Sequence, residues 1–476
     1  MELSKLTKNF DVYTLGEDKE ISGLCCNSKE VKANDLFFCI NGTHTDGHKF
    51  ALDAVKNGAV AVVCEKELDL PKQVTQIIVP SSRKAMGEFA SEFYGNPQKN
   101  MKVIMVTGTN GKTTTTYLLK KVLEDAGFSV GLIGTNGTLI GNKHINSNLT
   151  TPDPIELFSI LRQMEKNGCD FVCMEASAHA LYLDKLSGLK ADISILTNIT
   201  QDHLDFFRTM ENYVKAKSKL FEPESSRFCV INTDNSLAKS IFENCAIPAI
   251  SVGTSKDADI NAFDIAQNRV GQSFTANIVG ELQNFNLKLD GKFNVSNALG
   301  VIAVAELLGL DQKQVSKSLS SVEPIPGRFN KIDKNGVSVI IDYAHTPDGI
   351  QNILTATREI AKKGKVIAVF GCGGNRDAAK RPIMGQIACN LADCVVITSD
   401  NPRYEDPEAI IANICKDILG YTNYICEPDR SKAIKKALSL AKSGDVVAIL
   451  GKGNENYLDV CGKKIPYSDQ EEVEKI

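Results

Sequence analysis

A glycine-rich junction from Gly108 to Thr114 constrains the fold of this sequence more than any other segment. The run before it, MKVIMVTG, is apolar without alternation, which is typical of a strand buried on both faces of a parallel sheet. A helical pattern follows from Thr113 to about Ala126. Glycines let backbone N–H groups turn toward phosphate oxygens, and a helix N-terminus adds its positive dipole end. The junction therefore predicts a phosphate-binding loop in a parallel α/β domain.

The loop has the short GxxGKT form, because Val106 stands where the common P-loop pattern has its first glycine. Lys112 is expected to reach the terminal phosphates of a nucleotide, and the Thr113 hydroxyl to hold Mg²⁺. The structural alternative is a fortuitous strand–turn–helix junction, which the GKTT sequence disfavours. ATP with Mg²⁺ is the predicted ligand.

The chain is long enough for about three domains, since it has 476 residues and domains average about 150. Breaker clusters fall at Tyr94–Pro97 and Pro324–Gly327, and apolar strands alternate with helical patterns on both sides of the second cluster. Short alternating strands from Ile260 to Leu289 indicate an antiparallel side sheet. The predicted fold class is α/β in three domains: a smaller N-terminal α/β domain (1–97), a central P-loop domain with a doubly wound parallel sheet and the antiparallel side sheet (98–329), and a C-terminal Rossmann-like α/β domain (330–476).

Charge and hydropathy exclude several classes of partner. Lys and Arg total 54 against 58 for Asp and Glu, so no nucleic-acid footprint is expected. No run of about 18 apolar residues occurs, and the N-terminus lacks a signal-peptide pattern. A cytoplasmic protein without membrane insertion is expected. Its 14 scattered cysteines are interpreted as reduced core thiols rather than a zinc site or disulfide framework.

Polar residues follow two further strands of the central segment. Glu175 ends the run DFVCME, while Asp202 and His203 follow SILTNI. Ligands of doubly wound sheets gather at the carboxyl ends of strands, so these side chains should face the phosphates as Mg²⁺ ligands or water-orienting groups. His203 as a hydrogen-bonded loop residue is the alternative. The three lysines of YVKAKSKLF are, by pattern alone, a solvated basic face.

Three strands of the last segment end in polar motifs, which are Gly371–Asp377, Asp400–Pro407 and Gly451–Asn456. They should converge on one crevice that offers two arginines, Arg376 and Arg403, and two carboxylates, Asp400 and Glu455. Arginine binds carboxylates and carboxylates bind ammonium groups, so a zwitterionic amino acid is the complementary ligand. Separate capping turns are the alternative. An ATP site together with a site for an amino-acid amine predicts an enzyme that forms an amide bond. The carboxylate would first be phosphorylated by ATP and then attacked by the amine.

The motifs together resemble the Mur ligase family over essentially the whole chain, and within it the members that add meso-diaminopimelate. The resemblance is carried by TGTNGKTT, TTPDP, MEASAHAL, TNITQDHLD, YVKAKSKLF, FNVSNALG, PGRF, DYAHTPD, GGNRDAAKRP, DNPR and GKGNE. It implies an ADP-forming ligase that joins meso-diaminopimelate to UDP-N-acetylmuramoyl-L-alanyl-D-glutamate in cytoplasmic peptidoglycan precursor synthesis, acting as a monomer. The alternatives are a lysine-adding ligase of the same family, a folylpolyglutamate synthetase and an ATP-dependent switch protein without ligation.

The resemblance also implies roles for single residues. The catalytic set is Lys112, Glu175, His203 and Lys217, the last as a carbamate. Thr113 and Glu175 would bind a first Mg²⁺, and Glu175, His203 and carbamylated Lys217 a second. ATP would contact Gly108, Thr109, Asn110, Gly111, Lys112, Thr113, Thr114, Asn297, Arg328, Asp342 and His345.

The two other substrates have predicted sites of their own. The UDP-muramoyl dipeptide would contact Ser28, Thr43, Asp46, Gly47, His48, Thr150, Thr151, Ser177 and Lys185. Diaminopimelate would contact Arg376, Asp400, Asn401, Pro402, Arg403, Gly451 and Glu455. Arg403 is the main argument for diaminopimelate over lysine, because lysine lacks the second carboxylate and would leave a buried arginine unpaired. Departures from the usual motifs occur at Asn27, Lys29, Lys185 and Asn454.

Overall fold

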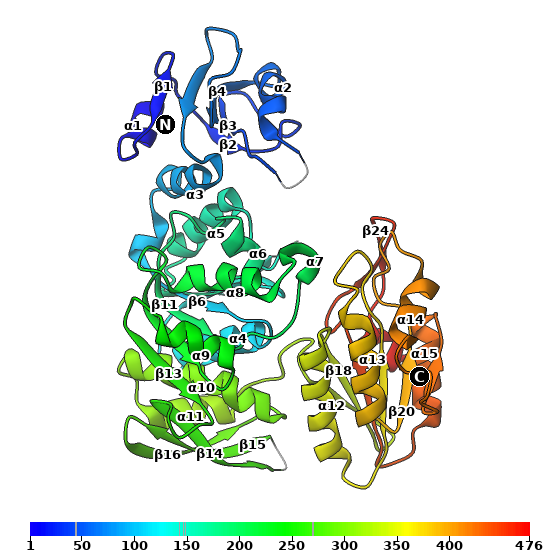
Figure 1. Ribbon diagram of the computed structural model, residues 1–476. Helices are drawn as coiled ribbons and strands as arrows, with labels where there is room; N and C mark the ends of the chain where they lie inside the picture. Colours follow the sequence, from blue (N-terminus) through cyan, green and yellow to red (C-terminus); the bar gives the residue numbers. More distant parts are fainter. Residues whose placement is uncertain (43–44, 142, 146, 148, 269–270) are drawn as a thin grey trace.

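The computed structural model describes residues 1–42, 45–141, 143–145, 147, 149–268 and 271–476. Its principal described strands form three sheets along the chain, of 5, 11 and 6 strands, and a separate two-stranded ribbon lies near the C-terminus. The N-terminal sheet lies at one end of the central body, and the C-terminal body lies beside the central one (Figure 1). The α/β fold class expected from the sequence is confirmed. The domain boundaries at 97 and 329 stay predictions.

The N-terminal sheet has the order β1-β5-β4-β3-β2, and only the β1–β5 pair is antiparallel. Its elements are α1 (Leu3–Thr7), β1 (Tyr13–Leu15), β2 (Gly23–Cys25), β3 (Asp35–Phe38), η1 (Gly47–Phe50), α2 (Ala51–Lys56), β4 (Ala59–Cys64), β5 (Thr75–Ile78), α3 (Ser82–Phe93) and η2 (Pro97–Asn100). Helix α3 joins this region to the next, since Phe89 belongs to the N-terminal core and Ala90 to the central core.

The central sheet has the order β16-β15-β14-β13-β12-β11-β6-β10-β7-β8-β9. Its strands are β6 (Lys102–Thr107), β7 (Val130–Gly134), β8 (Gly137–Ile140), β9 (Lys143–Ile145), β10 (Phe171–Glu175), β11 (Ala191–Leu196), β12 (Ser226–Asn232), β13 (Ala249–Gly253), β14 (Ile260–Gln267), β15 (Gln272–Ile278) and β16 (Glu281–Leu287). Pairing is parallel from β14 to β7 and antiparallel beyond them at both ends. The expected antiparallel strands are therefore continuous with the parallel sheet.

Strand β6 is buried on both faces, as its unbroken apolar run predicts. Ile104 and Val106 belong to a core that also contains residues of α4, α10 and α11. Val103 and Met105 point to the opposite core, which includes residues of α5, α6 and α8. The helices are α4 (Lys112–Asp125), α5 (Pro154–Lys166), α6 (Ala178–Tyr182), α7 (Leu204–Phe207), α8 (Met210–Ser218), η3 (Lys219–Phe221), α9 (Ser236–Glu243), α10 (Lys292–Leu307) and α11 (Gln312–Ser320).

The C-terminal sheet has the order β17-β18-β22-β19-β20-β21, and only β17 is antiparallel to its neighbour. Its core includes residues of α12, α13 and α14 on one face and of α15 and α16 on the other. The elements are β17 (Asn330–Lys334), β18 (Val337–Asp342), α12 (Pro347–Ala361), β19 (Val366–Phe370), α13 (Lys380–Leu391), β20 (Cys394–Ile397), α14 (Pro407–Cys415), β21 (Tyr424–Cys426), α15 (Arg430–Leu440), β22 (Val446–Leu450), β23 (Tyr457–Val460), β24 (Lys463–Pro466) and α16 (Asp469–Glu474).

The state of the cysteines and the hydropathy of the helices concern the whole chain. All 14 cysteines are free thiols, and several, including Cys173 and Cys229, are fully buried in the central cores. In the described part of the chain, no helix is both long and apolar enough to span a bilayer.

Candidate active site

One cavity of about 740 Å³ is lined by loops that follow strands of both the central and the C-terminal sheets. It brings together predicted residues from distant parts of the chain. These are Thr109, Asn110, Gly111, Lys112, Thr113, Thr114, Thr150, Glu175, Ser177, His203, Asn297, Arg328, Asp342, His345, Arg376, Asp400, Asn401, Arg403, Gly451 and Glu455. The predicted nucleotide loop and the predicted amino-acid crevice therefore open onto the same space.

The glycine loop leads directly from β6 into α4. Gly108 and Gly111 have φ values of +151° and +87°, and Gly111 stands immediately before the first residue of α4. Lys112 Nζ donates to the carbonyl oxygens of Gly108 and Thr109, both at 2.9 Å. Burial lowers the pKa of Lys112, although the charge of Glu175 opposes this shift. The loop thus holds a buried amine on backbone oxygens next to the helix N-terminus.

Glu175 lies behind the loop at the end of β10. Its Oε1 accepts from Thr113 Oγ1 at 2.8 Å and from the Thr135 N–H at 2.9 Å. Arg328 Nη2 donates to Thr113 Oγ1 at 2.9 Å and stacks on Tyr343 at 4.6 Å. The carboxylate is fully buried, so it is a fixed anionic group beside the hydroxyl expected to hold Mg²⁺.

Lys217 does not lie on a solvated face. It is 1% exposed, whereas Lys215 on the same helix α8 is exposed. Its Nζ donates to Gly108 O at 2.8 Å and lies 4.7 Å from the centre of the Tyr213 ring. Burial, followed by the charge of Lys112, lowers the pKa of Lys217 well below its usual range. The prediction of a fully solvated basic face is therefore wrong for Lys217, whose amine is buried, while Lys215 is exposed as predicted.

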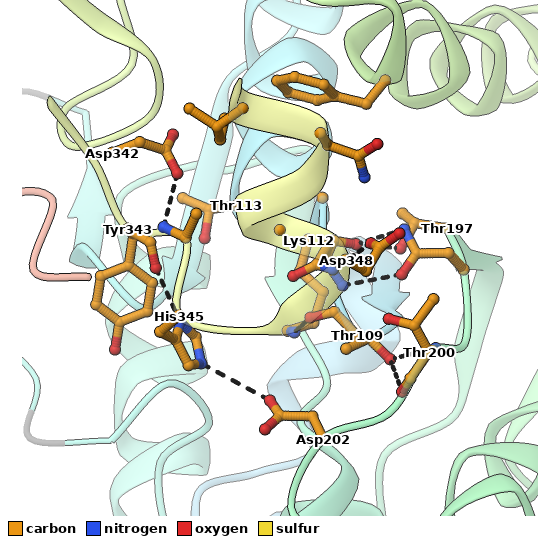
Figure 2. Close-up of a pocket in the computed structure, with 18 of the residues that line it drawn as sticks. Thr109, Lys112, Thr113, Thr197, Thr200, Asp202, Asp342, Tyr343, His345 and Asp348 are labelled. Carbon is orange, nitrogen blue, oxygen red and sulfur yellow. Dashed lines mark hydrogen bonds and ion pairs between the residues drawn. The ribbon is translucent and has the colours of Figure 1, made fainter. Parts of the chain in front are cut away.

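Asp202 connects the central body to the C-terminal one. Its Oδ1 accepts from Lys380 Nζ at 3.0 Å, and its Oδ2 lies 3.7 Å from His345 Nε2 and 3.4 Å from His203 Nε2. Figure 2 shows His345 pointing from its loop toward Asp202. Burial raises the pKa of Asp202, but the close contact with His345 and the charge of Lys380 outweigh this effect and hold the pKa well below its usual range.

The residues expected around the nucleotide already form hydrogen bonds within the protein. Asn297 is buried and donates to Asn294 Oδ1 at 3.0 Å. Asp342 accepts from the N–H groups of Phe329 and Ala344, both at 2.7 Å, so each of its oxygens is already used by backbone. Burial raises the pKa of Asp342. The position of Asp342 fixes the turns around Phe329 and Ala344 on either side of the cavity.

The amino-acid crevice is built at the ends of β20 and β22. Asn401 Nδ2 donates to Glu455 Oε2 at 2.9 Å, and Lys452 Nζ donates to that same oxygen at 2.9 Å. Arg403 has φ +52°, and its Nη1 donates to Gly374 O at 2.8 Å. The three strand-end motifs are therefore linked by hydrogen bonds, as their equivalent positions in the sheet predict.

The remaining predicted residues lie outside this cavity lining. Thr151 Oγ1 lies 3.2 Å from Ser177 Oγ, which belongs to a lining residue, and Lys185 pairs with Asp153 at 2.6 Å. In the N-terminal region Asp46 caps η1 and lies 2.6 Å from His48 Nδ1. The lining also omits Gly108, Lys217, Pro402, Ser28 and Gly47. Thr43 lies outside the described residues. The ligand roles of all site residues stay predictions.

Sequence reasoning did not assign several residues that organise the site. Tyr213 lies between Lys217 and His203, with its ring centre 6.3 Å from that of His203. Asp348 accepts from Asn110 Nδ2 at 2.7 Å, and Lys380 reaches Asp202. Tyr213, Asp348 and Lys380 each belong to a motif noted in the sequence. The position of a motif at a strand end does not show which of its side chains contacts another domain.

The donor groups fit a divalent cation bound together with a nucleotide. Glu175 and Thr113 offer adjacent oxygens at 2.8 Å. In the ranges that the structure covers, no three His, Cys, Asp or Glu side chains gather as a ready-made metal site. The protein alone therefore supplies few ligands, which is typical of Mg²⁺ held largely by substrate phosphates and water.

The fold and site define a class of enzyme, a three-part α/β ligase that couples a nucleotide loop to an amino-acid crevice. The chain matches the Mur ligase family catalytic domain over residues 20–94, the Mur ligase middle domain over 106–305, and the Mur ligase glutamate ligase domain over 327–453.

Two curated relatives and one solved structure share a name. The chain is 43% identical to UDP-N-acetylmuramoyl-L-alanyl-D-glutamate--2,6-diaminopimelate ligase of Clostridium botulinum (strain ATCC 19397 / Type A), covering 100% of this chain and 99% of that one. The ligase of the same name from Syntrophomonas wolfei subsp. wolfei is 42% identical, covering 99% and 98%. A solved structure of that name has a TM-score of 0.69 and 32% identity, covering 96% and 94%. The chain belongs to the Mur ligase family.

Proposed function

We propose that this chain is an ATP-dependent ligase that adds meso-diaminopimelate to UDP-N-acetylmuramoyl-L-alanyl-D-glutamate during cytoplasmic peptidoglycan precursor synthesis. The observation that carries the proposal is the single cavity that the phosphate loop shares with the amino-acid crevice. The names of relatives at 43% and 42% identity support the choice of substrates. The chain acts as a monomer, because one copy contains both halves of the cavity.

The first step is transfer of the ATP γ-phosphoryl group to the D-glutamate γ-carboxylate. The loop N–H groups after Gly108 hold the phosphates, and Lys112 Nζ exchanges its loop carbonyls for phosphate oxygens. Thr113, Glu175 and His203 are the proposed Mg²⁺ ligands. Two bound Mg²⁺ ions would supply charge neutralisation of the phosphates. Asn297 contacts the adenine in this proposal.

Lys217 is the proposed carbamylation site. Its burial and its lowered pKa favour the neutral amine, which is the form that reacts with CO₂. The carbamate would replace a buried amine beside Gly108 by an anionic oxygen, and so would provide the metal ligand that a bare amine cannot. Mass spectrometry of the intact protein, with a gain of CO₂ that Lys217→Met removes, tests this step.

The second step is attack of the amino-acid amine on the acyl phosphate. Asp400, Asn401 and Glu455 hold the amino acid in this proposal, with Arg376 and Arg403 on its carboxylates. Thr150, Thr151, Ser177 and Lys185 hold the dipeptide. The N-terminal contacts around Ser28 and Thr43 to His48 hold the uridine nucleotide.

ADP release with each substrate omitted in turn tests the function. Rapid release is expected only when ATP, the muramoyl dipeptide and diaminopimelate are all present. ATP turnover that ignores amino acids would identify a nucleotide switch instead. A folylpolyglutamate synthetase is disfavoured by the family match of residues 20–94, and ADP release that depends on the muramoyl dipeptide would exclude it directly.

Competition between diaminopimelate and lysine tests the specificity. Diaminopimelate should be preferred, and Arg403→Ala should reduce that preference by about 10- to 100-fold, because it removes a charged hydrogen-bond donor for the distal carboxylate. Equal discrimination by the variant and the wild type would reject Arg403 as the specificity residue.

A further inference from the structure

Asp377 is a buried carboxylate that the proposed mechanism does not use. It lies between β19 and α13, is 5% exposed and lines the shared cavity. Its Oδ1 accepts from the Ala379 N–H at 3.0 Å. Its Oδ2 is buried and accepts no hydrogen bond from any group in the described ranges. A buried carboxylate oxygen without a donor is costly, so a donor from outside the chain is expected here.

Nearby basic residues do not supply that donor. Lys380 Nζ is committed to Asp202 at 3.0 Å. Arg381 Nη2 donates to Gly373 O at 3.2 Å and to Glu405 Oε1 at 3.0 Å. The cations that directly follow Asp377 in the chain thus point at other carboxylates, and the Oδ2 of Asp377 stays available to a ligand in the cavity.

The other carboxylates of the crevice are already engaged. Glu455 Oε2 accepts from both Lys452 and Asn401. Asp400 Oδ1 accepts from the N–H of Asn401 at 2.5 Å. Asp377 is therefore the crevice carboxylate with a buried oxygen that lacks a donor, in the part of the chain that the structure describes.

The loop that carries Asp377 is held close to the proposed reaction centre. It precedes Lys380 by three residues, and Lys380 spans the gap between the two bodies to Asp202, which lies beside His203. The loop that carries Asp377 is therefore anchored to the central body next to the proposed metal ligands. An amino acid in the crevice must present its attacking amine toward that body.

We propose that Asp377 binds the attacking ammonium group of the incoming amino acid and accepts its proton. Oδ2 takes one proton from the ammonium, and the nitrogen lone pair so freed forms the C–N bond with the acyl carbon. The C–O bond to the phosphoryl group breaks, and inorganic phosphate leaves with that electron pair. The second N–H proton lost from nitrogen passes to the departing phosphate. This inference rests on the proposed ligase function.

Asp377→Asn tests it, because the amide preserves the Oδ1 acceptor for Ala379 and removes the charge. We expect KM for diaminopimelate to rise by about 10- to 100-fold, with a lower kcat that recovers toward alkaline pH as the free amine becomes neutral. The matched control is Asp429→Asn, at an aspartate that caps α15 outside the cavity lining and accepts from Lys432 N at 3.1 Å. Its kinetic constants should equal those of the wild type.

Acyl-phosphate formation separates this inference from the proposed function. Positional isotope exchange in ¹⁸O-labelled ATP, measured with the muramoyl dipeptide but without an amino acid, should be the same in Asp377→Asn as in the wild type. A parallel loss of exchange, or unchanged KM and kcat for diaminopimelate, would overturn the role of Asp377. Absence of exchange and of ligation in the wild-type enzyme would instead overturn the ligase function.

Discussion

Gly111 shows how a single residue determines the shape of the nucleotide loop. Its φ of +87° lies in the left-handed region, and a Cβ at this position would lie 2.2 Å from Asn297 Oδ1. Only glycine avoids both the backbone strain and the clash. The close approach brings α4 and α10 together where the adenine and the phosphates are proposed to bind.

We predict that Gly111→Ala weakens ADP binding by at least about tenfold, because the loop and Asn297 must move apart. Isothermal titration calorimetry measures the effect. The matched control is Gly309→Ala, since Gly309 also has a positive φ, +69°, but has no neighbour within 4 Å of a new Cβ. The control should lose about 1–2 kcal/mol of stability and retain its ADP affinity. Equal affinities in all three proteins would contradict the prediction.

His203 should remain neutral in the ligand-free enzyme through the physiological pH range. Burial lowers its pKa to about 3, with opposition from the charge of Asp202. The neutral form exists above that value, so the imidazole nitrogen can bind a metal from pH 5 to 8. The unfolded chain binds the proton near pH 6.5, so this histidine should reduce folding stability as pH falls from about 6.5 toward 3. In NMR spectra, the imidazole signal missing from His203→Gln should not shift between pH 5 and 8, and a midpoint near 6.5 would refute the assignment.

At the scale of elements, α15 and α16 support the amino-acid crevice from behind. Arg430, the first residue of α15, pairs with Asp469 of α16 through two contacts of 2.7 Å. It also donates to Ser399 O and Leu450 O, at the ends of β20 and β22. Both partners are almost fully buried. The backbone carbonyls that precede Asp400 and Gly451 are thus held by one buried ion pair.

We predict that Asp469→Asn lowers the free energy of unfolding by about 3–5 kcal/mol, because the charge of Arg430 stays buried without its counter-ion. Urea unfolding followed by circular dichroism measures the change. Glu472→Gln is the control on the same helix, since the Glu472 pair with Lys475 has a 63% exposed lysine. It should change stability by about 0–1 kcal/mol. Similar losses in both variants would reject the proposed anchoring.

At the scale of the whole molecule, contacts between the central and C-terminal bodies assemble the cavity. Lys380 reaches Asp202, Asn110 reaches Asp348, and Lys292 pairs with Glu359. Figure 2 shows Asp348 near Lys112 and Thr197, although Asp348 lies on α12 of the C-terminal body and the other two belong to the central body. The two bodies must therefore remain together for the phosphate loop to meet the amino-acid crevice.

We predict that Lys380→Met opens this arrangement, because it removes the ammonium group that pairs with buried Asp202 at 3.0 Å. The radius of gyration from small-angle scattering should increase, and kcat/KM for diaminopimelate should fall by roughly 100-fold or more. Glu359→Gln is the control between the same bodies, since its pair with Lys292 is 2.9 Å long but 59% exposed at the lysine. The control should keep both values. An unchanged radius of gyration in Lys380→Met would reject the closure role.

The sequence predicted features that depend on local order along the chain. Strand β6, the turn at Gly108 and helix α4 follow from hydrophobic pattern and glycine spacing, because neighbouring residues alone decide them. Helix α4 occupies Lys112–Asp125, within one residue at each end of the range that its pattern predicts. Strand-end motifs indicated the crevice, since carboxyl ends of parallel strands must share one edge.

Only the tertiary structure decided which side chains lose water and which of them meet. Lys215 and Lys217 belong to the same basic pattern, yet Lys217 alone is buried against Gly108 and Tyr213. Asp202 and Lys380 are separated by 178 residues and form one buried pair. Burial and charge pairing depend on elements distant in sequence, so their energies are set by the packing of the whole chain. The sequence alone thus determined the elements and their motifs, whereas the assembled fold determined the chemistry of the cavity.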